Sequence, residues 1–286
     1  MSKLFGDMQD AARYSAERPA SNPALAQLLD AVGADTEAAR PATSAALHGC
    51  RRLEMPPLKR PFLVADDETP STHGAFEAYR ALRTKLVRFQ SSEGIRSVVV
   101  TSAEAGEGKT VSTLNLSLSL AQLPGQRVLL IDADLRTTGL SIVTGAVEAP
   151  GLAEVLAGQA AFEAALLSTN FPNLYIVGAG EAQMPAGDLF AGPKFKDFIG
   201  WCNEIFSMII VDCPPMIGLA DFDVISVACD SVLIIVRAGK TKRGTLTTLG
   251  PHLQGKKLLG VLLNGRERQH HKTRYGYYYA KIGQKR

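Results

Sequence analysis

The chain has 286 residues, of which 46% are hydrophobic, so it can bury the core of one large domain or two small ones. Its formal net charge of +3 is too small to indicate nucleic-acid binding by itself. The four cysteines show no paired spacing, which disfavours a metal centre and a disulfide framework and fits a reducing compartment.

Targeting and membrane signals are missing from the sequence pattern. The N-terminal sequence has no apolar run of signal-peptide length. No stretch reaches the roughly 18 uncharged apolar residues that a membrane-spanning helix needs. The sequence therefore predicts a cytoplasmic chain, and any link to a membrane would come through a partner.

Residues 1–70 are predicted to form a flexible arm. They are rich in alanine and proline and offer little apolar surface to offset the entropy of ordering. Within the arm, residues 22–32 have the spacing of a short amphipathic helix, which is the alternative for that stretch. Residues 50–63 mix charges with prolines, as a linker that crosses a surface does.

An amphipathic helix is predicted after Ser71, because Ser71 or Thr72 can cap its start. Apolar residues recur at steps of three and four along one face: Phe76, Tyr79, Leu82, Leu86 and Phe89. The opposite side carries Glu77, Arg80 and Arg83. These charges form either a solvated face or a contact between subunits.

From residue 96 onward, apolar strands alternate with helical patterns. The predicted strands span residues 97–102, 127–134, 174–178, 207–215, 231–239 and 258–264. The predicted helices span residues 110–123, 152–167, 192–204, 219–228 and 243–254. This alternation predicts an α/β domain over residues 71–264, with a mostly parallel sheet covered by helices on both faces. Ligands of such a sheet bind at the carboxyl ends of its strands.

Residues 98–110, VVVTSAEAGEGKT, combine an apolar strand, a glycine-rich turn and a Lys-Thr pair that opens a helix. Such a turn surrounds phosphate with backbone N–H groups and the helix N-terminus, so the pattern predicts a P-loop NTPase; an accidental turn is the simpler alternative. Lys109 would reach the β- and γ-phosphates of ATP, and the Thr110 hydroxyl would bind Mg²⁺. The predicted nucleotide-binding residues of the loop are Ala105, Gly106, Glu107, Gly108, Lys109, Thr110 and Val111.

Acidic residues end two of the predicted strands. Asp132 and Asp134 end one buried strand and Asp212 ends another, and buried carboxylates need partners. Beside a phosphate loop, Mg²⁺ is the expected partner, with N-capping of the following helices as the alternative, strongest for Asp134. Arg136 could touch a phosphate or pair with one of these aspartates. Asn264 ends the last strand, where its amide either reads a purine edge or serves a turn.

The tail over residues 265–286 differs from the sheet. It carries seven Lys and Arg residues against one Glu, and it has no periodic apolar residues, so it is predicted to be mobile. Four tyrosines fall within five residues: Tyr275, Tyr277, Tyr278 and Tyr279.

One position in the loop argues against the ParA and MinD ATPases. That class has a second lysine early in its phosphate loop, and Glu104 stands at the matching position here. A carboxylate there cannot contact a phosphate favourably.

Taken together, TSAEAGEGKT, VLLIDADLR, IIVDCPP and the terminal tyrosines resemble the bacterial tyrosine kinases of capsule and exopolysaccharide synthesis. The first three motifs correspond to their Walker A, Walker A′ and Walker B. The resemblance covers roughly residues 72–279, and it departs at Ala105, where the family often has Pro. It implies transfer of the ATP γ-phosphoryl group to the tail tyrosines of a neighbouring subunit.

The resemblance also implies roles for single residues. Thr110, Asp132 and Asp212 would hold Mg²⁺, Asp132 would serve as base or hydroxyl-orienting group, and Asp134 would assist. The catalytic set is then Lys109, Asp132, Asp134 and Asp212. EAYRALRT resembles the family's E-x-x-R-x-x-R helix, so that Glu77, Arg80 and Arg83 would pack subunits into a ring.

A separate membrane-spanning chain-length protein is implied as partner, because family members work with one and no span exists here. Two alternatives remain: a MinD-like ATPase that switches partners without tyrosine transfer, and a non-catalytic nucleotide-binding scaffold of a polysaccharide export complex. Nucleic acid is not an expected partner, since the fold supplies no groove for a strand to accompany the basic tail.

Overall fold

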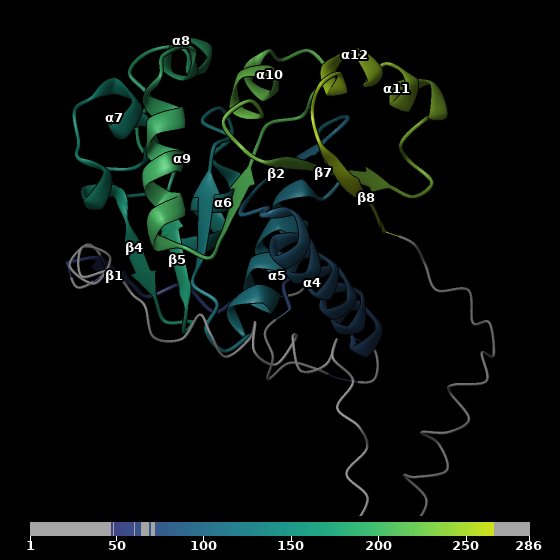
Figure 1. Ribbon diagram of the computed structural model, residues 1–286, viewed down its shortest axis with the longest axis horizontal. Helices are drawn as coiled ribbons and strands as arrows, with labels where there is room; N and C mark the ends of the chain where they lie inside the picture. Colours follow the sequence, from purple (N-terminus) through teal and green to yellow (C-terminus); the bar gives the residue numbers. More distant parts are fainter. Residues whose placement is uncertain (1–46, 48, 60, 64–68, 70–71, 266–286) are drawn as a thin grey trace, which may run out of the picture. The chain divides into compact units, whose positions relative to one another are not determined.

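The computed structural model describes residues 47, 49–59, 61–63, 69 and 72–265, which build one eight-stranded sheet with helices on both faces (Figure 1). In spatial order the strands are β1 (Arg51–Leu53), β4 (Leu167–Thr169), β5 (Leu174–Val177), β3 (Val128–Asp132), β6 (Met208–Asp212), β2 (Ser97–Ser102), β7 (Ser231–Arg237) and β8 (Leu258–Asn264). All neighbours pair in parallel except β4 and β5. The predicted α/β fold with a mostly parallel sheet is confirmed.

Two helical layers cover the sheet. One face carries α4 (His73–Glu93), α5 (Lys109–Ala121) and α6 (Gly139–Thr144). The other face carries α7 (Leu152–Ala157), α8 (Ala186–Ala191), α9 (Lys194–Ile205), α10 (Asp221–Ile225), α11 (Arg243–Thr247) and α12 (Gly250–Leu253). A separate hydrophobic core lies on each face of the sheet. Alternate residues of β2 pack into one core or the other, because successive side chains of a strand point to opposite faces. Val98 and Val100 pack with α5, and Val99 packs with α9.

Two helices are shorter in the structure than the sequence pattern predicts. The helix predicted over residues 152–167 ends at Gly158, which has a φ of 75°. It is followed by a 3₁₀ turn, Phe162–Ala165, and by β4. The helix predicted over residues 243–254 divides into α11 and α12, where Pro251 opens the second piece. The sequence did not predict β1, β4, α6 or α8.

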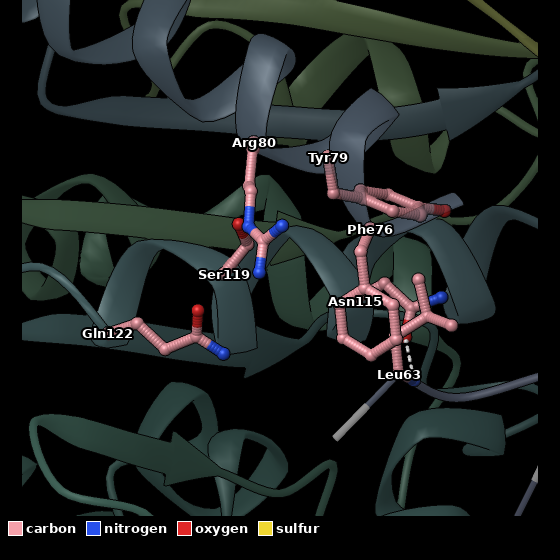
Figure 2. A pocket seen from close by; sticks show the side chains of 7 residues that line it. All are labelled: Leu63, Phe76, Tyr79, Arg80, Asn115, Ser119 and Gln122. Carbon is pink, nitrogen blue, oxygen red and sulfur yellow. Dashed lines mark hydrogen bonds between the residues drawn. The ribbon is translucent and has the colours of Figure 1, made fainter. Parts of the chain in front are cut away.

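The segment before α4 packs on the domain where the structure describes it. β1 adds to the sheet beside β4, and the Met55 N–H donates to Asn170 Oδ1 (3.1 Å). Further on, Asn115 of α5 accepts from the Leu63 N–H (2.8 Å) and donates to the Pro61 carbonyl (3.2 Å). Figure 2 shows Leu63 and Asn115 at a small cavity between α4 and α5. Part of the predicted arm is therefore ordered against α5.

Other predictions fall outside the described residues. These include the short helix over residues 22–32 and the tail tyrosines Tyr275, Tyr277, Tyr278 and Tyr279. Among the helices that the structure describes, none has the length and apolar character needed to cross a bilayer.

Candidate nucleotide-binding and catalytic site

The phosphate loop joins β2 to α5 and lies at the carboxyl end of the central strands. Gly106 and Gly108 have φ values of 77° and 90°, which only glycine adopts at little cost. A Cβ on Gly108 would also overlap the side-chain amide of Asn264 at the end of β8. The loop therefore needs Gly108 both for its backbone turn and for its contact with the neighbouring strand.

Lys109 is the first residue of α5, and its ammonium bridges two carboxylates. Nζ donates to Asp134 Oδ2 and Asp212 Oδ1, both at 3.2 Å. Burial alone would lower the pKa of Lys109, but the two carboxylates outweigh it and raise this pKa above its usual value. Lys109 is therefore charged at neutral pH and is positioned between β3 and β6.

Asp212 ends β6 and is fully buried. The Thr110 hydroxyl donates to its Oδ2 (2.8 Å), and the Thr113 hydroxyl donates to its Oδ1 (3.1 Å). Burial raises the pKa of the Asp212 carboxyl, while Lys109 opposes that rise. The donors from α5 thus fix both oxygens of this carboxylate.

Asp132 ends β3 and is also fully buried, but it faces other partners. Its Oδ2 accepts from both the backbone N–H (2.8 Å) and the hydroxyl (2.7 Å) of Ser141 in α6. Its Oδ1 accepts from the Asp134 N–H (3.2 Å). Burial, with the nearby charge of Asp212, raises the pKa of Asp132 to about 6, and the Ser141 hydrogen bonds limit this rise.

Asp134 and Arg136 follow β3. Asp134 accepts from the Thr137 N–H (3.2 Å) through Oδ1, and its Oδ2 faces Lys109. Arg136 does not pair with a strand-end aspartate. Its guanidinium instead donates to both oxygens of the buried Asp221 on α10 (2.7 and 3.3 Å).

Residues at the ends of β7 and β8 form hydrogen bonds with the phosphate loop, on the side away from β3 and β6. The Arg237 guanidinium donates to the Gly106 carbonyl (3.0 Å), and Asn264 Nδ2 donates to the Glu107 carbonyl (3.0 Å). The buried Glu107 carboxylate accepts from the Thr241 hydroxyl and from the Glu104 N–H. Asn264 Oδ1 accepts from the Gly265 N–H (2.8 Å), so both ends of the Asn264 amide have partners within the chain.

The oxygen atoms beside the loop suit a small divalent cation. Thr110 and Asp212 offer a hydroxyl and a carboxylate in mutual contact, and Mg²⁺ prefers such oxygens. Within the described part of the chain, no three His, Cys, Asp or Glu side chains form a metal-binding group. An ion at Thr110 and Asp212 would therefore depend on the nucleotide for its remaining ligands, as Mg²⁺ does with phosphates.

The predicted interface residues lie on α4 and differ in their surroundings. Arg80 donates to Glu77 (2.6 Å) on the exposed side of the helix, and Figure 2 shows it near the end of α5. Arg83 donates to the Ser119 carbonyl (2.8 Å) in the last turn of α5. Glu77 is exposed and Arg80 is half-buried over the Phe76 ring, whereas Arg83 joins two helices of the same subunit.

The structure thus brings the loop, Lys109, Asp132, Asp134, Asp212 and Asn264 to one edge of the sheet, and it leaves Glu77, Arg80 and Arg83 outside this edge. Sequence reasoning missed Ser141, Thr113 and Thr241. Thr113 was detectable, since it lies one helical turn after Lys109. Ser141 and Thr241 carry no local signal, because their partners are distant in sequence.

Comparisons with known proteins agree with this geometry. A family model described as an AAA domain matches residues 95–249. The tyrosine-protein kinase YwqD of Bacillus subtilis (strain 168) is 30% identical over 207 residues, which cover 72% of this chain and 86% of YwqD.

Two solved structures are also similar to this chain. The BceF tyrosine kinase domain matches with a TM-score of 0.61 and 29% identity, over 67% of this chain and 77% of that domain. The septum site-determining protein MinD of Pyrococcus horikoshii, in complex with Mg-ADP, matches with a TM-score of 0.51 and 30% identity, over 60% of this chain and 72% of MinD. The extent of the match to YwqD goes beyond a shared fold, and the chain belongs to the bacterial tyrosine-protein kinase family.

Proposed function

We propose that this chain transfers the γ-phosphoryl group of ATP to tyrosine, and that its acceptors are the tail tyrosines Tyr275, Tyr277, Tyr278 and Tyr279 of a neighbouring copy. The observation that carries the proposal is the bridge from Lys109 to Asp134 and Asp212 directly after a phosphate loop. Phosphoryl transfer depends on positioning and charge neutralisation more than on covalent help from the protein, and this site supplies both.

Each residue of the site has a proposed task. The loop N–H groups of residues 105–111 bind the phosphates, and Lys109 turns from its carboxylates to the β- and γ-phosphates. Asp134, freed from Lys109, assists at the same edge of the sheet. Asp132 orients the tyrosine hydroxyl and takes its proton. Asn264 supports the loop by donating to the Glu107 carbonyl, and it would lie close to the purine of the bound ATP.

Mg²⁺ is the proposed metal, held by Thr110 and Asp212 with Asp132 beside them. When bound, it would neutralise charge on the transferred phosphate. The single ammonium of Lys109 forms ion pairs with two carboxylates, Asp134 and Asp212, which leaves negative charge for a cation to balance. The similar MinD structure holds Mg-ADP, which supports the proposal that this chain binds Mg²⁺ and an adenine nucleotide.

The proposal extends to the assembly. Glu77, Arg80 and Arg83 would pack copies into a ring, so that one subunit's tail reaches its neighbour's site. A separate membrane-spanning polysaccharide chain-length protein would recruit the cytoplasmic chain to the inner face of the membrane and activate it. Phosphorylation of the tail, at about −1.5 to −2 charges per site, would loosen the ring and so regulate capsule or exopolysaccharide synthesis and export.

A mixing experiment tests the reaction and its direction. One variant carries Lys109→Met with an intact tail, and the other has an intact site with all four tail tyrosines changed to Phe. Neither should form tail phosphotyrosine alone with Mg²⁺ and ATP, but the mixture should label the Lys109→Met chain. The cytoplasmic segment of the membrane partner is included, since the isolated chain is expected to be weakly active.

The outcome separates the competing functions. ATP hydrolysis by the wild type without phosphotyrosine would favour a MinD-like switch. Nucleotide binding without turnover would favour a scaffold. Equal phosphotyrosine in the wild type and in the Lys109→Met variant would contradict the kinase proposal.

A further inference from the structure

The turn after β7 is built against the phosphate loop. The Arg237 N–H donates to the Thr241 hydroxyl oxygen, and the Thr241 N–H donates to the Arg237 carbonyl, both at 3.0 Å. The two residues also hold the loop directly, through the Gly106 carbonyl and the Glu107 carboxylate. The position of this turn relative to the loop is thus set at both of its ends.

Lys240 lies at the centre of that turn, and its ammonium is aimed at the loop. A Cβ added to Gly106 would lie 3.1 Å from Lys240 Nζ. Gly106 and Lys240 are both exposed, so this is the open side of the loop. Among the described residues, none makes a hydrogen bond or ion pair with the Lys240 ammonium. The Lys240 ammonium thus lies beside the phosphate loop with no partner in the described part of the chain.

The loop itself is short of positive charge. It carries carboxylates at Glu104 and Glu107, and its Lys109 is shared between two aspartates. The Arg237 guanidinium is engaged by the Gly106 carbonyl. A polyphosphate bound there would bring several negative charges, and a desolvated phosphate is best bound by a cation within hydrogen-bond reach.

We propose that Lys240 binds the polyphosphate of the nucleotide from the turn between β7 and α11, and so supplies the cation that the loop lacks at position 104. This inference rests on the proposed nucleotide site. It adds a binding residue some 130 positions after the loop in sequence, in the turn that follows β7.

The test is calorimetric titration of the full-length chain with ATP and with ADP, in the presence of Mg²⁺. Lys240→Gln should raise the Kd for ATP about tenfold, the order expected for one charge-assisted hydrogen bond. Lys240→Arg should restore most of the affinity. The matched control is Lys242→Gln, which removes the same charge from an exposed lysine two residues further on and should bind like the wild type.

Two further readouts distinguish phosphate binding from support of the fold. The thermal midpoint without nucleotide should not change in Lys240→Gln, since the side chain is exposed. The difference in Kd between Lys240→Gln and the wild type should shrink as salt rises, because screening weakens an exposed ion contact.

Equal Kd values for Lys240→Gln and Lys242→Gln, with ATP binding intact, would overturn the assignment of Lys240 and leave the proposed function standing. Wild-type chain that binds no ATP would overturn both.

Discussion

Asp132 and Asp212 are register partners at the ends of the adjacent parallel strands β3 and β6. Despite this adjacency, their side chains have separate surroundings. Asp132 is bound by Ser141 of α6, and Asp212 is bound by Lys109, Thr110 and Thr113 of α5. Two neighbouring carboxylates in different environments can take different roles, as in other enzymes with paired acids.

Asp212→Asn should abolish most tyrosine phosphorylation. The amide keeps the size of the side chain and can still accept from Thr110, but it removes the charge that faces Lys109 and the proposed Mg²⁺. Loss of one such electrostatic contact costs about 100-fold or more in rate. Initial rates of phosphotyrosine formation at saturating ATP measure this loss. A variant with more than half of the wild-type rate would exclude Asp212 from the reaction.

Ser141→Ala should slow the reaction through Asp132. The Ser141 hydroxyl donates to Asp132 and accepts from the Ala179 N–H, so its removal leaves a buried acceptor and a buried donor short of a partner. We expect a loss of about 1–2 kcal/mol in the free energy of unfolding. The rate should fall roughly tenfold with little change in ATP affinity, since Ser141 acts by positioning.

The control for Ser141→Ala is Ser117→Ala. Ser117 is also buried, but its hydroxyl donates only to the Thr113 carbonyl of its own helix, so its loss should be nearly neutral. Denaturant unfolding and steady-state kinetics on both variants supply the comparison. An equal effect of the two changes on rate would show that Ser141 has no particular bearing on Asp132.

The fold was predictable where the sequence pattern is local. The six longer strands, β2, β3, β5, β6, β7 and β8, were all predicted, because each is an apolar run of four to seven residues between turn residues. β1 and β4 have three residues each, which is too short for a period to be visible. They are held by pairing at the sheet edge, and pairing is a tertiary contact that local patterns do not encode.

The same limit applies to the site. The loop, Lys109 and the strand-end aspartates were predictable, since strand order in a parallel sheet brings such ends together. The partner of Arg136 was not, because Asp221 lies on α10, 85 positions later. The contact of Thr241 with Glu107 likewise joins segments that are 134 positions apart. The sequence gives the chemistry of these side chains but not their neighbours.

Gly108→Ala should prevent nucleotide binding. The methyl group would collide with the Asn264 amide, and the φ of 90° is strained for alanine. The loop would then lose its contact with β8, and the N–H groups that face the phosphates would move. Titration with ATP and Mg²⁺ measures the loss.

Gly125→Ala is the matched control for Gly108→Ala. Gly125 has a similar φ of 75°, but a Cβ there meets open space. It should lower the free energy of unfolding by about 1–2 kcal/mol from backbone strain and leave ATP affinity unchanged. Intact ATP binding in Gly108→Ala would show that the loop tolerates the collision, contrary to the proposed fit.

The ring hypothesis gives a separate expectation for α4. The double variant Glu77→Ala, Arg80→Ala removes a surface ion pair and the contact of Arg80 with the Phe76 ring, so the free energy of unfolding of the single chain should fall by at most about 1 kcal/mol. If these residues pack copies together, the mass in solution measured by light scattering should fall to that of smaller assemblies. Phosphorylation of tails in trans should fall with it. An unchanged mass would remove this face of α4 from the interface.

Arg83→Ala should act differently from that pair, because its guanidinium donates to the Ser119 carbonyl at the end of α5. A cation at a helix C-terminus is favourable, and this one also joins α4 to α5, so its loss should cost about 1–2 kcal/mol in the free energy of unfolding. Arg88→Ala, an exposed change on the same helix, should cost almost nothing. If Arg83→Ala lowers the assembly mass while its unfolding matches that of Arg88→Ala, then Arg83 serves the interface and not the packing of α4 on α5.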